Sequence, residues 1–248
     1  MVSRDWTDAY YGELYLDSVA DLLTPALSAA EAEVIAALLE LRPGQRALDL
    51  ACGHGRHARA LARRARVVGL DRSGGYLERA RGAGASLVRG DLRRLPFREG
   101  AFDAAFSWYA SLFMWDDPAN LAALGEAARV LRPGGRLLVH HANPLRLARE
   151  PEARAERALP GGGRVEETSR FDPRTGVDAC ARRLARSDGT VLAGTAHLRY
   201  YSPAEWSALA PRAGLRLLGI TCTSRARHRT ERLDADAPDL IALAEKVA

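Results

Sequence analysis

Cysteine and lysine are scarce in this sequence, and long apolar runs are absent. The three cysteines, Cys52, Cys180 and Cys222, are odd in number and far apart, so neither a disulfide framework nor a zinc ribbon is indicated. No His, Cys and Asp residues have metal-ligand spacing, so we predict no metal. Charges interrupt every apolar stretch before the roughly 20 residues that a membrane span needs. The N-terminus also lacks a signal-peptide pattern, so we expect no membrane partner and a cytoplasmic location.

The net charge of the chain is basic, and arginine supplies nearly all of the positive charge. The net charge is +5 and the isoelectric point is about 9.4, a balance that can indicate nucleic acid or an anionic substrate. Four arginines, however, recur at helical spacing, which is typical of the solvated face of one helix. They are Arg56, Arg59, Arg63 and Arg66. This interpretation disfavours nucleic acid as a partner, although RNA stays an alternative.

Short apolar stretches alternate with helical segments from residue 47 onwards. This alternation predicts parallel strand–helix–strand units, and therefore an α/β fold with a doubly wound sheet. A further helix and strand are expected near the C-terminus, and a last helix is expected from Asp239. The expected strands cover residues 47–50, 67–70, 86–89, 102–106, 136–140 and 215–221.

Two regions lie outside this alternation. Residues 6–23 form a helical, aromatic-rich lead, which we interpret as a lid. Ser28, with Glu31 completing a capping box, is expected to begin a helix that runs to about Leu41. Residues 142–198 are too long for one crossover helix and read as a small β-rich insertion. We therefore expect one domain, 1–248, made of a lid (1–27), a cofactor-binding core (28–141), a cap or dimerisation insertion (142–198) and a segment that completes the sheet (199–248).

A glycine loop follows the first expected strand. Residues 53–58 match G-x-G-x-x-G/A, in which glycines permit a tight turn and a helix N-terminus presents free N–H groups. The pattern alone fits NAD equally well. Asp49 precedes the loop, where a carboxylate repels a pyrophosphate but suits an ammonium or sulfonium group. Asp71 and Asp91 end the second and third strands, where carboxylates can accept hydrogen bonds from a ribose and from an adenine amino group.

The ordered series of motifs resembles the class I S-adenosylmethionine-dependent methyltransferases over roughly residues 30–142. The segments that carry this resemblance are Leu48–Arg56, Val68–Ser73, Gly90–Leu92, Phe102–Ala104 and Val130–Leu137. The resemblance implies a Rossmann-like sheet of seven strands, mostly parallel. It also implies one antiparallel strand, contributed by the region after Arg225, and S-adenosylmethionine as the cofactor.

The resemblance also assigns the cofactor contacts. Gly53 and Gly55 should approach the methionine part of the cofactor, Asp71 should hold the ribose, and Asp91 with Leu92 should frame the adenine. The complete set of expected contacts is Tyr11, Asp49, Ala51, Gly53, Gly55, Asp71, Arg72, Asp91, Leu92 and Ser107.

The acceptor is expected above the carboxyl ends of the fourth and fifth strands. The fourth strand runs into Ser107–Ala110, whose sequence is SWYA. Methyltransferases of nucleic-acid amino groups often carry Asn/Asp-Pro-Pro-aromatic at this place, so methylation of adenine or cytosine amino groups is disfavoured. Trp108 and Tyr109 are candidates to contact the substrate, and the alternative is that they pack in the core.

Three further side chains are candidates for the chemistry. His141, near the end of the fifth strand, is the candidate general base, and its alternative is a histidine that is merely hydrogen-bonded there. Arg170 and Arg199 in and after the insertion are candidates to pair with a substrate carboxylate or phosphate. The insertion could equally form the surface of a homodimer.

The sequence therefore predicts an enzyme that transfers a methyl group from S-adenosylmethionine to an oxygen or nitrogen of a small-molecule acceptor by in-line displacement. Three alternatives stay open: an RNA methyltransferase, a nicotinamide-dependent reductase, and a protein that binds S-adenosylmethionine for other chemistry.

Overall fold

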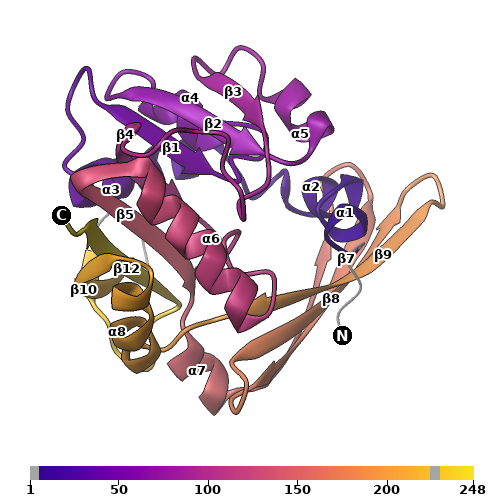
Figure 1. Cartoon of the computed structure of the whole chain (residues 1–248). Helices are drawn as coiled ribbons and strands as arrows, with labels where there is room; N and C mark the ends of the chain where they lie inside the picture. The colour runs from indigo at the N-terminus through magenta and orange to yellow at the C-terminus, as the bar shows by residue number, and fades with distance from the viewer. Residues whose placement is uncertain (1–5, 224–229) are drawn as a thin grey trace.

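The computed structural model describes residues 6–223 and 230–248. It contains a large central sheet and a smaller second sheet that projects to one side (Figure 1). Helices α1 and α2 lie between the small sheet and the part of the core that carries α5. In the part of the chain that is described, no helix is long and apolar enough to cross a membrane.

The central sheet has eight strands in the order β11-β10-β12-β5-β4-β1-β2-β3. Strands β1 to β5 are parallel neighbours, with β4 between β5 and β1. The strands are β1 Arg46–Leu50, β2 Arg66–Asp71, β3 Ser86–Arg89, β4 Phe102–Ser107, β5 Leu131–Ala142, β10 Leu215–Thr223, β11 Thr230–Arg232 and β12 Asp239–Lys246. The prediction of a doubly wound, mostly parallel α/β sheet is confirmed.

The C-terminal strands differ from two expectations. Strand β12 is inserted antiparallel between β5 and β10, as the family resemblance implied, so the helix expected from Asp239 is wrong. The apolar run Leu240–Ala244 is buried because a central strand is covered on both faces. Strand β11 also pairs antiparallel with β10 and adds an eighth strand at the edge, where seven were expected.

Helices cover both faces of the central sheet. Helices α3 and α4 pack on one face, on side chains such as Phe106 and Ile241, and α6 and α8 pack on the other, on side chains such as Leu137 and Val139. The helices of the core and its connections are α3 Pro25–Leu38, α4 Arg56–Leu61, α5 Gly74–Arg79, α6 Asp117–Val130, α7 Pro144–Arg149 and α8 Pro203–Arg212.

Helix α3 begins one turn before the predicted capping box. Thr24 is its N-cap and accepts a hydrogen bond from the Leu27 amide at 3.1 Å, and Pro25 occupies the first turn. Threonine followed by proline is a strong helix start, because proline has the right φ and needs no N–H partner there. The expected start at Ser28 is therefore wrong, and Glu31 lies inside the helix with an exposure of 1%.

The insertion is a four-stranded antiparallel sheet in the order β6-β7-β8-β9, which confirms its β-rich character. Its strands are β6 Glu152–Ala158, β7 Gly163–Asp172, β8 Val177–Arg186 and β9 Val191–Arg199. Helices α1 (Trp6–Tyr10) and α2 (Glu13–Val19) pack on it through an apolar cluster that includes Tyr10, Leu14 and Leu184. Arg186 adds ion pairs to Glu13 and Asp17. The N-terminal helices are therefore attached to the insertion.

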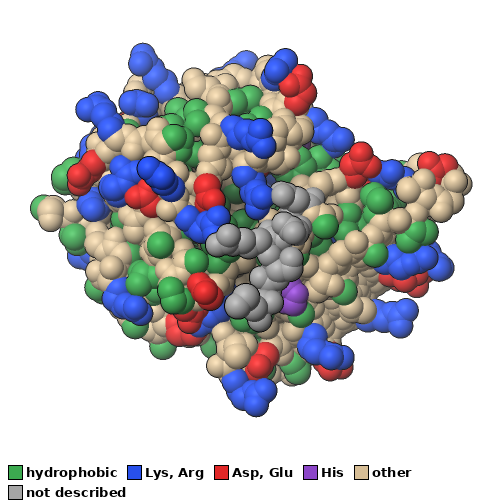
Figure 2. Space-filling view, turned by 45° about the vertical axis from the view of Figure 1, so that its right-hand side comes forward, with side chains coloured by type: hydrophobic (Ala, Val, Ile, Leu, Met, Phe, Trp, Pro, Cys, Tyr) green, Lys and Arg blue, Asp and Glu red, His purple; other side chains and the backbone are tan. Residues whose placement is uncertain are grey.

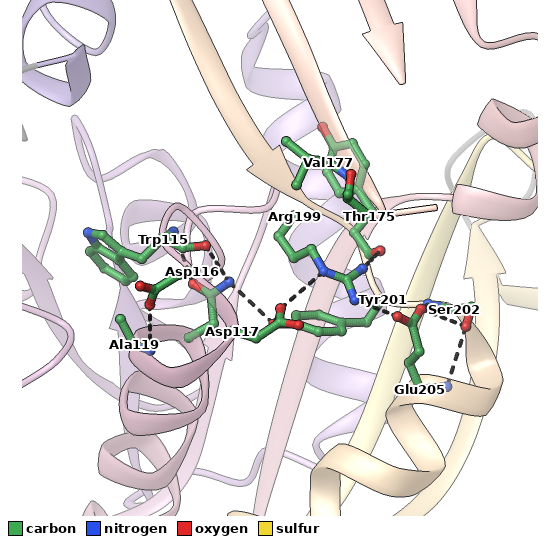
Figure 3. Close-up of polar contacts among 12 residues, drawn as sticks. Trp115, Asp116, Asp117, Ala119, Thr175, Val177, Arg199, Tyr201, Ser202 and Glu205 are labelled. Carbon is green, nitrogen blue, oxygen red and sulfur yellow. Dashed lines mark hydrogen bonds and ion pairs between the residues drawn. The ribbon is translucent and has the colours of Figure 1, made fainter. Parts of the chain in front are cut away.

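Arg199 joins the insertion to the core and does not face a substrate. Its guanidinium group donates to Asp117 at 3.1 Å, to the Tyr200 carbonyl at 2.6 Å and to Glu205 (Figure 3). The group also lies 4.1 Å from the centre of the Tyr201 ring. These contacts tie the end of β9 to the starts of α6 and α8, so the prediction that Arg199 binds the substrate is corrected.

We expect Arg199→Ala to lower the free energy of unfolding by about 3 kcal/mol, because it removes a nearly buried cation that several partners share. Arg170→Ala is the matched control. Arg170 is 79% exposed and lies 3.4 Å from Glu152, so its loss should change stability by less than about 0.5 kcal/mol. Urea denaturation measures both, and equal effects of the two substitutions would contradict this account.

Candidate active site

The backbone of the glycine loop is left-handed at three positions, and two of these are glycines, which adopt that conformation without strain. Ala51, Gly53 and Gly55 all have positive φ, at 61°, 54° and 75°. Gly55 is the N-cap of α4, and a Cβ there would lie 3.0 Å from the Cβ of Ala80. Glycine is therefore needed at position 55 both for the backbone and for the approach of α5 to α4.

Asp71 ties the end of β2 to this loop. One carboxylate oxygen accepts from the Gly53 amide at 2.9 Å, and the other accepts from the Ser73 amide at 2.8 Å. Burial raises the pKa of Asp71, against the lowering effect of these amides. Carboxylate oxygens have further lone pairs, so Asp71 can still accept hydrogen bonds from a ligand.

A cavity of about 270 Å³ opens at the carboxyl ends of β1 to β4, and α1 and α2 form its other side. Most of the predicted cofactor contacts line this cavity, namely Tyr11, Ala51, Gly53, Asp71, Arg72, Asp91 and Leu92. The substrate candidates Trp108 and Tyr109 line it as well, beside Met114 and Trp115. The structure thus brings together residues that are up to 108 positions apart, from Thr7 to Trp115.

Other predicted residues lie outside the cavity lining. Gly55 acts through the loop geometry, and Ser107 is fully buried at the end of β4. Arg170 is exposed on β7, so the prediction that it pairs with a substrate in this cavity is corrected. Among the residues that the structure describes, no group of three or more His, Cys, Asp or Glu side chains could hold a metal ion.

Asp49 lies beside the loop in a fully enclosed position. It is 2% exposed, and its Oδ2 atom has no hydrogen-bond partner among the described residues. Burial raises the pKa of Asp49 to about 8; the positive charge of Arg56 lowers it and the nearby Asp71 raises it further. A cation bound above the loop would stabilise the ionised form of this carboxyl group.

Asp91 reaches the cavity while it is bound by Arg93. The Arg93 guanidinium donates to both carboxylate oxygens, at 3.0 and 2.6 Å, and lies 4.9 Å from the centre of the Trp115 ring. The hydrogen bonds from Arg93 lower the pKa of Asp91, so it is ionised near neutral pH. An ionised carboxylate can accept from an amino group, as the adenine assignment requires.

A buried network around Glu31 is absent from the sequence-based expectations. Glu31 accepts from Arg56, from His57 at 3.0 Å and from the Tyr109 hydroxyl at 2.6 Å. Burial alone would raise the pKa of Glu31, but the His57 hydrogen bond and the Arg56 charge hold it at about 2. The arginine spacing predicted that Arg56 lies on a solvated helix face. This prediction is wrong, because Arg56 is buried against Glu31. The sequence did contain a signal for the burial of Glu31, because Glu31 shares one helix face with Ser28 and Ile35, which are buried in α3.

His141 does not reach the cavity. It is fully buried, its Nδ1 donates to the Ala142 carbonyl at 2.8 Å, and its Nε2 accepts from the Trp206 indole at 3.0 Å. Burial lowers the pKa of His141 to about 4. Both ring nitrogens are engaged inside the core, which contradicts the prediction of a general base and agrees with the alternative of a hydrogen-bonded strand-end histidine.

Comparison with known proteins finds sequence similarity in the segment that forms most of the parallel part of the central sheet. A family model described as a methyltransferase domain matches residues 47–135. The chain is 41% identical over 102 residues to a demethylmenaquinone methyltransferase from Corynebacterium kroppenstedtii, across 41% of this chain and 43% of that relative. It is 31% identical over 124 residues to a probable tRNA methyltransferase 9B from Mus musculus, across 50% of this chain and 28% of that relative. The chain spans less than half the length of these curated relatives.

The likeness among solved structures extends further along the chain. The CcbJ methyltransferase from Streptomyces caelestis matches with a TM-score of 0.76 at 24% identity, over 95% of this chain and 98% of that chain. At this level of identity the match concerns the fold. It shows that the N-terminal helices and the insertion, together with the core, form an arrangement found in another protein.

We expect the free energy of unfolding to fall as the pH drops from about 6.5 to about 4. His57 and His141 both have a pKa of about 4 when folded and about 6.5 when unfolded, so these two groups take up protons on unfolding in this window. Asp49, whose folded pKa is about 8, releases at most one proton on unfolding and only partly offsets them. His141→Gln keeps an acceptor for Trp206 and should make the loss of stability shallower. Urea denaturation between pH 4 and 7 measures this slope.

The same variant tests the placement of His141. His141→Gln should retain the binding of a cofactor in the cavity, because the side chain lies outside its lining. If a stable His141→Gln variant binds cofactor normally but has lost activity, with a changed pH–activity profile, the hypothesis that His141 is a general base would be supported again.

Proposed function

The chain carries a class I S-adenosylmethionine-dependent methyltransferase domain, and we propose that it transfers the methyl group to an oxygen or nitrogen of a small-molecule acceptor. The observation that carries this proposal is the cavity at the carboxyl edge of the sheet. There the glycine loop, Asp71 and Asp91 line the same cavity as Trp108 and Tyr109. The first group suits a nucleoside cofactor and the second leaves an apolar wall for an acceptor.

The residues present fit S-adenosylmethionine. Asp71 would accept from the ribose hydroxyls, and Asp91 with Leu92 would hold the adenine. Asp49, with one buried oxygen that has no described partner, would stabilise the positive charge of the methionine part from below the loop. The cofactor supplies an electrophilic methyl carbon when bound.

The chain's own residues supply position and exclusion of water. With the cofactor bound, the acceptor atom would displace the thioether from the methyl carbon, and a proton on the acceptor would pass to water or buffer. Tyr15 and Leu16 of α2, and Tyr11 between α1 and α2, line the cavity together with Trp108 and Tyr109. Orientation of the acceptor within this lining is what in-line displacement needs, and no general base is required of this site.

A small acceptor is favoured by the aromatic lining of the cavity, and one relative is named as a demethylmenaquinone methyltransferase. RNA is the second candidate, because another relative is named as a probable tRNA methyltransferase. On the face shown in Figure 2, however, Lys and Arg side chains are interspersed with Asp and Glu and form no continuous basic surface. The homodimer, the single-domain organisation and the cytoplasmic location stay predictions.

We expect the protein to bind S-adenosylhomocysteine, and Asp71→Asn to weaken this binding at least tenfold. The amide cannot accept equally from the Gly53 amide and from a ribose, so about 1.4 kcal/mol or more of binding free energy is lost. Asp103→Asn is the control, since Asp103 bonds Arg132 and the Arg46 amide outside the cavity. Calorimetry measures both.

The transfer itself is tested with labelled S-adenosylmethionine and a panel of phenols, quinols, amino sugars and tRNA. Product formation with any small acceptor supports the proposal. Labelling of tRNA alone would move the chain to the RNA alternative. Binding of a nicotinamide cofactor without S-adenosylhomocysteine would favour the reductase, and binding with no methylated product would favour other chemistry.

We expect the affinity for S-adenosylhomocysteine to rise between pH 6.5 and 8.5. The ligand's ammonium group favours the ionised form of Asp49, whose pKa is about 8 without ligand, so binding should release up to one proton below that pH. Calorimetry in two buffers of different ionisation enthalpy measures the release. Asp49→Asn should abolish it, and equal proton release by that variant would assign the effect to another group.

A further inference from the structure

The wall of the acceptor pocket contains an unusual turn. Directly after β4, Tyr109 and Ala110 both have φ of 62°, a left-handed conformation that non-glycine residues rarely adopt. The side chains of Trp108 and Tyr109 line the cavity at this turn. Such a conformation persists only where neighbouring groups hold it, so the shape of the wall depends on what lies behind it.

His140 of β5 holds the turn from behind. Its Nδ1 accepts from the Tyr109 amide at 3.1 Å, and its backbone carbonyl accepts from the Ala110 amide at 2.9 Å. Its ring stacks on Trp108 with centroids 4.2 Å apart and planes at 5°, and meets the Tyr109 ring edge-on at 5.2 Å. One residue therefore contacts both strained amides and both aromatic side chains of the wall.

Asp239, which lies beside Nε2, selects the tautomer of the His140 ring. The Nε2 atom lies 3.2 Å from Asp239 Oδ2, and because a carboxylate can only accept, Nε2 carries the hydrogen. Asp239 is itself held by the amide and the hydroxyl of Thr223. This arrangement leaves a lone pair on Nδ1, which is the group that the Tyr109 amide requires.

We propose that His140 is a positioning residue for methyl transfer: its Nδ1, which is the hydrogen-bond acceptor in the tautomer that Asp239 selects, fixes the Trp108–Tyr109 wall against which the acceptor is oriented. His140 is 4% exposed and lies outside the cavity lining, so it acts only through the turn. The orienting role rests on the proposed function, whereas the control of the turn does not.

Two substitutions separate the two sides of the ring. His140→Asn places a carbonyl oxygen near the position of Nδ1 and can still accept from the Tyr109 amide. His140→Gln reaches toward Asp239 and leaves that amide without its acceptor. We expect hydrogen exchange of residues 108–111 to stay within about threefold of wild type in the first variant and to rise at least tenfold in the second.

The binding of S-adenosylhomocysteine should change by less than about threefold in both variants. With an acceptor from the panel, His140→Gln should raise the KM for that acceptor more than it lowers kcat, and His140→Asn should restore it. His141→Gln is the matched control, because it alters the neighbouring buried histidine without touching the turn. It should leave exchange at residues 108–111 unchanged.

Nitrogen-15 NMR of the wild-type ring gives a readout that needs neither activity nor a variant. We expect the tautomer with hydrogen on Nε2. Hydrogen on Nδ1, or equal exchange at residues 108–111 in both His140 variants, would overturn the proposal. If His140→Gln does not fold, Asp239→Ala, which removes the acceptor for Nε2, replaces it, and unchanged exchange and an unchanged tautomer in that variant would overturn the proposal as well. Loss of S-adenosylhomocysteine binding in the wild type would contradict only the proposed function.

Discussion

The arrangement of the cavity depends on one buried carboxylate, Glu31. It lies inside α3 and receives hydrogen bonds from Arg56 and His57 at the start of α4 and from Tyr109 after β4. A buried carboxylate is stable only when it is paired and hydrogen-bonded, so these three elements must keep their relative positions. The glycine loop ends at α4 and the acceptor wall begins at Tyr109. Glu31 therefore fixes the position of the glycine loop relative to Tyr109.

The same wall is held from both directions. Glu31 holds the Tyr109 hydroxyl at the front, and His140 holds the Tyr109 amide behind it. Left-handed backbone at two non-glycine residues costs about 1 to 2 kcal/mol each, and the contacts on both sides offset this cost. A wall kept in a single strained conformation orients a bound acceptor better than a mobile loop would, because less conformational freedom is lost in the transition state.

The core of the fold could be predicted from the sequence because it depends on local patterns. Apolar strands that end in Asp71 and Asp91, and glycines at positions that need positive φ, are visible in the chain itself. His141 and Arg199 could not be assigned correctly, because their roles depend on tertiary partners such as Trp206 and Glu205. The C-terminal strand was mistaken for a helix because an apolar run buried on both faces has no strand periodicity.

The contacts that shape the cavity extend beyond the segment that the family model matches. That segment ends at residue 135 and contains the glycine loop, Asp71 and Asp91, and also Trp108 and Tyr109. The N-terminal helices, the insertion on which they pack, and the His140–Asp239 pair all lie outside that segment. The family model covers the glycine loop and the carboxylates at the strand ends, whereas Glu31 and His140, which hold Tyr109, lie beyond it. Acceptor specificity therefore has to be determined from the whole cavity and not from the shared motifs.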